Sequence, residues 1–195
     1  MGGSRRLLRA YAGLAVALTL SFAQAAAAGD RPVSIRIDNF GQINDHYYRG
    51  AQPEAQDFKD LAALGIRTVI DLQKDGSAEE QQLVEHAGMK FYRIPMTTTD
   101  RPSDAAVQQF LSLVNNPANQ PVYVHCQGGR HRTGVMTAAY RMTQDGWTAD
   151  QAYAEMKKYG FETLLGHPVL KKFVYDFYAT LPAQSNRAAV KSGGN

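Results

Sequence analysis

The stretch PVYVHCQGGRHRTGVMTAAY, residues 121–140, decides the fold. Its first four residues are apolar or β-branched, which predicts a short buried strand. Its last six residues are typical of a helix. The loop between them contains glycines, and a strand that leads through such a loop into a helix brings backbone amides together around an anion. Cys126, the only cysteine of the chain, stands at the start of this loop, and Arg132 follows six positions later.

Segments with strand and helix patterns alternate on both sides of the loop. We expect strands at 34–37, 47–49, 68–72, 91–94 and 121–124, and helices at 52–64, 79–87, 107–114, 135–145, 148–159 and 168–181. Thr148 and Gln151 have the spacing of a capping box at the start of the helix at 148–159. The alternation predicts an α/β fold, a single domain with a mainly parallel central sheet flanked by helices and a helical C-terminal cluster. We assign this domain to residues 29–181 and expect a flexible tail at 182–195.

Residues 1–28 have the three parts of a secretory signal. Three arginines between positions 5 and 9 form a basic start, an apolar run follows at 10–23, and the alanines at 26–28 form a cleavage site of the A-x-A type. The run is short for a membrane span of about 20 residues. We therefore expect cleavage near Ala28 and a periplasmic or secreted protein with no stable membrane insertion.

The net charge of +3 comes entirely from the three signal arginines, because 18 basic and 18 acidic residues remain without them. The charge balance therefore does not indicate a nucleic-acid partner. A single cysteine has no internal partner for a disulfide in an oxidising compartment. Cys126 is thus either a reactive thiol or an inert buried one.

The residues around Cys126 suit a reactive thiolate. A helix N-terminus and a nearby cation both favour the ionised form of cysteine, and Cys126 has the following helix and Arg132. Thr133 can donate its hydroxyl to the thiolate. His125 is expected to support the loop through hydrogen bonds from behind the nucleophile.

The same loop suits a bound phosphate. Its glycines allow the backbone to approach an anion closely, and the planar fork of Arg132 matches two phosphate oxygens. Arg130 and His131 either widen a positive pocket for polyanionic substrates or are merely solvated. The expected phosphate-binding residues are Gln127, Gly128, Gly129, Arg130, His131 and Arg132.

Attack of sulfur on a phosphate ester needs a second group that protonates the departing alcohol or phenol. Asp100, in the polar loop after the strand at 91–94, is the preferred candidate. Asp104 is the second candidate, although its place just before a helix also suits a cap. Because the loop amides and Arg132 stabilise the equatorial oxygens, the reaction needs no metal or other cofactor.

Other polar residues are expected to have structural roles. Arg49 and Asp71 could each face a substrate, but a structural ion pair, possible between these two, is the preferred interpretation. The histidines at positions 46, 86 and 167 lack the spacing of metal ligands and are assigned to the surface or to helix caps.

The string His-Cys-x-x-Gly-x-x-Arg-Thr-Gly at 125–134 resembles the signature of the cysteine-dependent protein tyrosine and dual-specificity phosphatases. Residues 48–53 (YRGAQP) are similar to an element near the start of the small atypical dual-specificity members. Residues 130–134 are similar to the loop ending in fungal and plant members that act on inositol pyrophosphates. The resemblance covers residues 40–161, and the signal at 1–28 is similar to that of a periplasmic bacterial branch.

The resemblance implies Cys126 as nucleophile, Arg132 as phosphate clamp and Asp100, 26 residues before the cysteine, as general acid. This spacing is shorter than in the larger dual-specificity enzymes, so the choice between Asp100 and Asp104 stays open. The implied activity is metal-independent hydrolysis of phosphate monoesters through a cysteinyl-phosphate. The implied substrates are proteins carrying phosphotyrosine, phosphoserine or phosphothreonine, or inositol phosphates, bound in a shallow pocket.

Two alternative functions remain from the residues alone. A rhodanese-like sulfurtransferase also uses a cysteine loop before a helix, although such loops are usually shorter and lack the Thr-Gly continuation. A phosphate-binding module without catalysis is the other alternative. The retention of Cys126, Arg132, Thr133 and a candidate acid argues against it.

Overall fold

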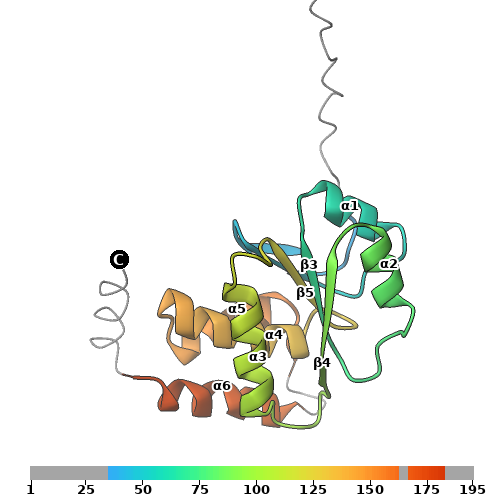
Figure 1. The fold of residues 1–195 in the computed structure, drawn as a ribbon. Coiled ribbons are helices and arrows are strands. Elements are labelled where there is room, and N and C mark those ends of the chain that lie inside the picture. The colour runs from blue at the N-terminus through green and yellow to red at the C-terminus, as the bar shows by residue number, and fades with distance from the viewer. Residues whose placement is uncertain (1–34, 163–166, 183–195) are drawn as a thin grey trace, which may run out of the picture. The chain divides into compact units, whose positions relative to one another are not determined.

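A computed structural model describes residues 35–162 and 167–182 (Figure 1). The predicted signal at 1–28, and all but the first residue of the predicted tail at 182–195, lie outside these ranges. The strands of the described part are β1 (Gly41–Asn44), β2 (Tyr47–Gly50), β3 (Thr68–Gln73), β4 (Lys90–Met96) and β5 (Val122–His125). The helices are α1 (Asp57–Ala63), α2 (Glu80–His86), α3 (Asp104–Asn115), α4 (Arg132–Tyr140), the π-helix η1 (Arg141–Asp145), α5 (Ala149–Lys158) and α6 (Pro168–Thr180).

The five strands form one sheet in the order β1-β2-β5-β3-β4. The last four strands are parallel to one another, and β1 is antiparallel to β2. Every residue of β3 and β5 is buried, as expected for parallel strands covered on both faces. The predicted α/β fold with a mainly parallel sheet and a helical C-terminal cluster is therefore confirmed.

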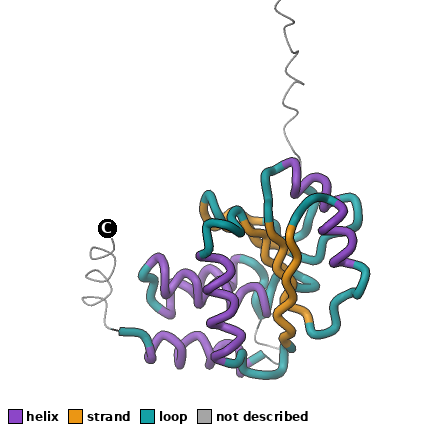
Figure 2. The backbone as a smooth tube through the Cα atoms, in the orientation of Figure 1, coloured by secondary structure: helices purple, strands orange, loops and turns teal. Residues whose placement is uncertain are grey.

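Alternate residues of the central strands point into two separate apolar cores. Val69 and Tyr123 pack with residues of α1 and α2, whereas Ile70 and Val124 pack with residues of α3 to α6. Figures 1 and 2 show the same arrangement, with α1 and α2 on one side of the strands and α3 to α6 on the other. Because the side-chain period of a strand is two, each strand contributes to both cores.

Two expectations near the start of the domain are wrong. Residues 35–37 form no strand; the first strand is β1, and the buried Ile37 packs into the core from a loop. The first helix begins at Asp57 rather than at Gln52. The Asp57 carboxylate accepts a hydrogen bond from the amide of Glu54 at 2.8 Å, which stabilises a turn in front of the helix.

Later boundaries also shift by a few residues. Pro95 does not end its strand, because β4 continues to Met96; β4 is an edge strand, where the missing amide of proline costs no hydrogen bond. The helix after the Cys126 loop begins at Arg132, three residues before the expected Val135. Thr148 and Gln151 form the capping box that their spacing predicted.

The carboxyl ends of three parallel strands lie side by side. His125, the last residue of β5, pairs with Gly50 of β2 and Asp71 of β3. Ligands of parallel sheets bind at this edge, and the chain leaves β5 there to form the Cys126 loop. In the described part of the chain, no helix has the length and apolar character needed to cross a membrane.

Candidate active site

The loop from Cys126 to His131 connects the end of β5 to the start of α4. Cys126 is 3% exposed, and every residue of α4 is buried. The thiol therefore lies close to the N-terminus of a buried helix, where the helix dipole favours a negative charge. This is the strand, loop and helix arrangement that residues 121–140 predicted.

Three successive carbonyl groups of the loop are held by donors from the segment around β2. The amide of Gln52 donates to the carbonyl of Gln127 at 3.2 Å, and the Asn39 side chain donates to that of Gly128 at 2.7 Å. The Arg49 guanidinium donates to the carbonyl of Gly129. These donors draw the three carbonyls outward toward β2.

The outward carbonyls determine where the loop amides point. In a trans peptide the amide of the next residue points away from the carbonyl, so the amides of Gly128, Gly129 and Arg130 face the opposite side of the loop. Converging amides of this kind bind anions. Asn39, which holds one carbonyl, has a left-handed φ of 53°, and such backbone conformations concentrate at functional sites.

Gly129 is the loop position that only glycine fits. Its φ is +63°, and a Cβ there would lie 2.5 Å from the carbonyl carbon of Gly50 and 2.7 Å from the amide of Ala51. Both neighbours are backbone atoms, which cannot rotate away as a side chain can. The loop therefore packs directly on the end of β2.

Arg132 reaches from the start of α4 across the site. Its Nη1 donates to a carboxylate oxygen of Asp75 at 3.1 Å and to the carbonyl of Met96 at 3.3 Å. The hydrogen bond from Arg132 lowers the pKa of Asp75, which is exposed. The sequence reasoning missed Asp75, although an acidic residue just after β3 at the carboxyl edge of the sheet is a usable signal.

Thr133 is fully buried, and its hydroxyl oxygen has no hydrogen-bond partner among the residues that the structure describes. The predicted hydrogen bond to Cys126 is therefore not formed here. The hydroxyl remains available to a ligand or to the ionised thiol, and its role stays a prediction.

The two candidate acids have different surroundings. Asp100 accepts a hydrogen bond from the Thr97 hydroxyl at 2.8 Å and lines a hollow of about 270 Å³ together with Met96 and Lys74. Arg132 bonds the carbonyl of Met96, so this hollow adjoins the site. The side chain of Asp104 is 84% exposed and lies 3.7 Å from Arg101 in an ion pair.

The cap expected at Asp104 is formed by Ser103 instead, whose hydroxyl accepts the amide of Ala106 at 3.1 Å. Asp104 is the first residue of α3 and points into solvent. Asp100 as the acid, with Asp104 as the second candidate, stays a prediction.

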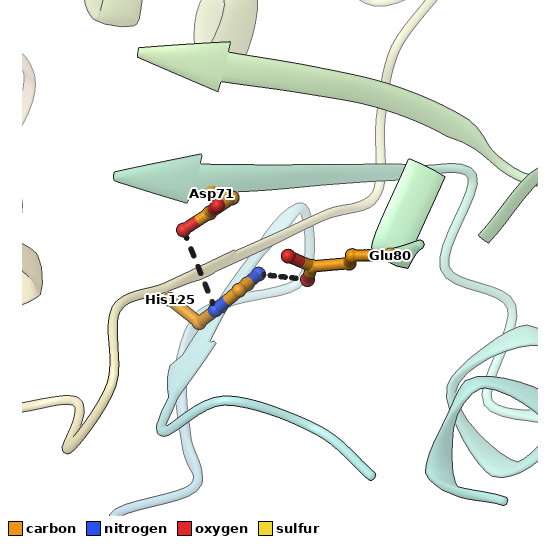
Figure 3. Close-up of side chains that lie close together, drawn as sticks. All are labelled: Asp71, Glu80 and His125. Carbon is orange, nitrogen blue, oxygen red and sulfur yellow. Dashed lines mark ion pairs between the residues drawn. The ribbon is translucent and has the colours of Figure 1, made fainter. Parts of the chain in front are cut away.

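His125 lies between two buried carboxylates, as Figure 3 shows. Its Nε2 is 2.7 Å from Glu80 and its Nδ1 is 4.0 Å from Asp71. Burial raises the pKa of Asp71. Burial is the largest influence on Glu80 and opposes its ionisation, but the contact and charge of His125, together with Gln52 and Arg93, lower the pKa of Glu80. The imidazole faces Glu80 at ion-pair distance rather than the loop, so it supports the loop by fixing the end of β5.

Asp71, Glu80 and His125 form the one group in the described chain whose atoms lie close enough to suggest a metal site, within 4.8 Å of one another. Their arrangement does not fit one metal ion, because the carboxylates face opposite nitrogens of the same ring (Figure 3). Arg93 also lies 2.7 Å from Asp71 and 3.4 Å from Glu80. These groups form a buried ion-pair network, for which no single sequence pattern gave a signal.

The side chains of two loop residues expected to contact phosphate, His131 and Arg130, pack on residues outside the loop. Burial, followed by the charges of His167 and Arg130, lowers the pKa of His131 to about 4, so this imidazole is neutral near pH 7. Its ring packs on His167, with centroids 3.9 Å apart, and on Phe161. Arg130 is exposed, and its side chain lies against Gly160. These contacts are made by the two side chains, whereas the backbone amide of Arg130 faces the inner side of the loop.

Arg49 does not form the ion pair with Asp71 that the sequence suggested. Asp71 is paired with Arg93, whereas Arg49 is fully buried under the Cys126 loop. The error has a physical reason: Arg49 and Asp71 lie on strands that are separated by β5.

One surface cavity lies away from this site. It has a volume of about 560 Å³ and lies beside α5, with Trp147 and Tyr159 in its wall. A hollow of about 340 Å³ adjoins the loop at Gln127 and is lined by Arg36 and three acidic residues.

Comparison with known proteins identifies relatives of this chain. A family model described as a DSP-PTPase phosphatase fused to NAD+ kinase matches residues 36–166. The probable tyrosine-protein phosphatase DG1060 of Dictyostelium discoideum is 30% identical over 126 residues, which cover 62% of this chain and 75% of that protein. The dual specificity protein phosphatase TpbA of Pseudomonas aeruginosa is 32% identical over 124 residues, or 63% of this chain and 55% of TpbA.

The inositol diphosphatase SIW14 of Saccharomyces cerevisiae is 27% identical over 130 residues, or 64% of this chain and 46% of SIW14. The chain thus spans about half the length of TpbA and of SIW14. The crystal structure of the SIW14 core catalytic domain covers 80% of this chain with a TM-score of 0.65, 22% identity and 94% of that domain. The crystal structure of TpbA covers 80% with a TM-score of 0.62, 25% identity and 91% of its own chain.

Proposed function

The chain belongs to the family of dual-specificity and tyrosine phosphatases, and we propose that it hydrolyses phosphate monoesters through a cysteinyl-phosphate intermediate without a metal. One observation carries the proposal: donors around β2 hold the carbonyls of residues 127–129 outward, so the loop amides surround the space next to Cys126. Such amides stabilise the three equatorial oxygens of a transferring phosphoryl group.

In the first step, the Cys126 thiolate attacks phosphorus, the sulfur–phosphorus bond forms and the ester oxygen–phosphorus bond breaks. Asp100 gives its proton to the departing oxygen. Arg132 binds two phosphoryl oxygens through its planar fork. Since Asp75 and Met96 hold the Nη1 of Arg132, the guanidinium is kept on the side of the site where Asp100 lies.

In the second step, a water molecule attacks the cysteinyl-phosphate. Asp100, now a carboxylate, accepts a proton from this water, and the sulfur–phosphorus bond breaks to release inorganic phosphate. Thr133 donates its unpartnered hydroxyl to the leaving sulfur. The acid and the base are thus the same side chain in its two protonation states.

The assay is hydrolysis of p-nitrophenyl phosphate by the reduced chain in EDTA, with Cys126→Ser and Arg132→Ala alongside. We expect turnover in the parent and none with Cys126→Ser. Rapid mixing should give a burst of p-nitrophenol close to one equivalent of enzyme if the phosphoenzyme accumulates. No turnover by the folded, reduced protein would overturn the proposal.

The acid is tested with phenyl phosphate, whose leaving group is poorer. Asp100→Asn should slow this reaction by about 100-fold or more, and Asp104→Asn should leave it within a factor of three. The reverse order would assign the acid to Asp104. The matched pair carries the same chemical change at two positions four residues apart.

For the substrate, we propose proteins with phosphotyrosine, phosphoserine or phosphothreonine, or inositol phosphates. Support comes from the relatives, which include enzymes named for phosphotyrosine, for dual specificity and for inositol diphosphates. Comparing kcat/KM for a phosphotyrosine peptide, a phosphoserine peptide and an inositol polyphosphate decides between them. A catalytic preference of at least 100-fold for one class would assign it.

We further propose that residues 1–28 export the protein to the periplasm or outside the cell. The support is the basic start, apolar run and alanine cleavage site of that segment. Expression of the full chain in a bacterium, followed by N-terminal sequencing of the periplasmic fraction, should find a chain that starts near Gly29. A chain that keeps residues 1–28 in the cytoplasm would contradict this.

A further inference from the structure

Arg49 is a buried cation that the reaction steps above do not use. It lies on β2 and its side chain is 0% exposed. One of its nitrogens donates to the carbonyl of Gly129 in the Cys126 loop. The face of its guanidinium lies 3.9 Å from the centre of the Tyr159 ring. Arg49 therefore touches the loop from the side opposite to the inward amides.

No carboxylate in the described part of the chain is paired with Arg49, and its Nε and Nη1 have no hydrogen-bond partner there. The nearby Glu155 is bonded to Arg141 at 2.7 Å. A buried charge without a counter-charge is strongly unfavourable, and burial lowers the pKa of Arg49 accordingly. An arginine nevertheless remains protonated. A negative group close by would stabilise the guanidinium at this position.

The ionisable groups that act on Arg49 from the surrounding elements are Tyr47, Tyr123, Tyr159, Glu155 and Cys126. Burial raises the pKa of Tyr47 and of Tyr123, so both phenols stay neutral. Tyr159 offers an aromatic face, and Glu155 is neutralised by its own arginine. The Cys126 thiolate, and the phosphoryl group that it attacks, are the remaining negative charges.

We propose that Arg49 is a positioning residue for the proposed phosphatase reaction: it holds the Gly129 carbonyl outward and is the buried counter-charge of the Cys126 thiolate. The first role acts through geometry, because the carbonyl that Arg49 holds belongs to the peptide whose amide faces the phosphate. The second role acts through charge. Tyr159 stacks on the guanidinium and fixes its plane.

Two substitutions of Arg49 distinguish its geometric role from its charge role. Arg49→Met keeps the length of the side chain but removes both the charge and the donor. Arg49→Lys keeps a charge but replaces the planar fork with a single ammonium group. Three measurements are made on each: kcat/KM for p-nitrophenyl phosphate, the rate of Cys126 alkylation by iodoacetamide against pH, and amide hydrogen exchange of residues 127–130.

For Arg49→Met, we expect kcat/KM to fall about 100-fold, because a displaced loop loses its alignment with the phosphate. The midpoint of the alkylation curve should move to higher pH by about one unit or more, because a nearby cation favours the thiolate. Amide exchange in the loop should become faster. For Arg49→Lys, the alkylation midpoint should stay near that of the parent, whereas kcat/KM and amide exchange should resemble Arg49→Met.

Val174→Ala serves as the control for stability, since Val174 is fully buried in α6 and belongs to neither role. It should lower the unfolding midpoint but leave the alkylation midpoint and loop exchange unchanged. If Arg49→Met does not fold, Tyr159→Leu replaces it: loss of the aromatic face should lower kcat/KM about 10-fold, with a much smaller loss for Tyr159→Phe.

The inference is overturned if folded Arg49→Met keeps kcat/KM within a factor of three and its alkylation curve coincides with that of the parent. If Arg49→Met does not fold, equal kcat/KM values of Tyr159→Leu and Tyr159→Phe would overturn the inference instead. If the parent itself does not hydrolyse phosphate esters, the proposed function fails, but the alkylation and exchange measurements still decide whether Arg49 acts on Cys126 and on the loop.

Discussion

Replacing Gly129 by alanine should damage both stability and activity, for a reason that the structure quantifies. The new Cβ would lie 2.5 Å from the carbonyl carbon, 2.6 Å from the carbonyl oxygen of Gly50 and 2.7 Å from the amide of Ala51. The left-handed φ of +63° adds a second penalty. The conformation costs about 1–2 kcal/mol, and the overlap with backbone adds about 1–3 kcal/mol.

Gly129→Ala should therefore lower the free energy of unfolding by about 2–5 kcal/mol, a large part of the about 5–15 kcal/mol of a typical domain. Gly65→Ala is the matched control, because Gly65 has a φ of +93° but no atom within 4 Å of the new Cβ. It should cost only the conformational part, about 1–2 kcal/mol, and leave turnover unchanged.

The assay is denaturant unfolding of the three proteins, combined with hydrolysis of p-nitrophenyl phosphate. Relief of the overlap must push the loop away from β2, which should lower kcat/KM by about 100-fold or more in Gly129→Ala. Equal destabilisation by the two substitutions would refute the close packing of the loop on Gly50. Full activity of a folded Gly129→Ala would refute the claim that this packing aligns the loop.

Further predictions concern the charged groups around the loop. Asp75→Asn should strengthen inhibition by inorganic phosphate a few-fold, because the carboxylate that holds Arg132 also competes with phosphate for it; weaker inhibition would show that holding Arg132 in place outweighs this competition. The pKa of His131 is lowered to about 4 in the folded chain. Between pH 6.5 and 4, His131 is therefore protonated in the unfolded chain but not in the folded chain. The free energy of unfolding falls as the pH drops through this range. His131→Asn should show a smaller drop in Tm between pH 7 and 4.5, and an equal drop would exclude this cause. Glu80→Gln should lower the free energy of unfolding by about 3 kcal/mol, because it removes the buried carboxylate that faces His125. A free energy of unfolding within about 0.5 kcal/mol of the parent value, measured with denaturant, would contradict this prediction.

Sequence patterns predicted those features that depend on neighbouring residues. The strand, loop and helix at 121–140, the capping box at Thr148 and the helix that starts at Pro168 all appear in the structure. In each case the signal is local: apolar periodicity, a capping side chain or a proline in the first turn. The expected strand at 34–37 failed because alternating residues there pack from a loop, which periodicity alone does not distinguish from a strand.

The sequence by itself determined the fold class and placed Cys126, Arg132 and the glycine loop together, because these residues are adjacent in the chain. Only the tertiary structure decided what holds the loop in shape. Asn39, Gln52 and Arg49 reach the loop from about 80 residues away in sequence, and parallel strand pairing brings β2 beside β5. A contact of this kind depends on which strands become neighbours, and no local pattern of residues carries that information.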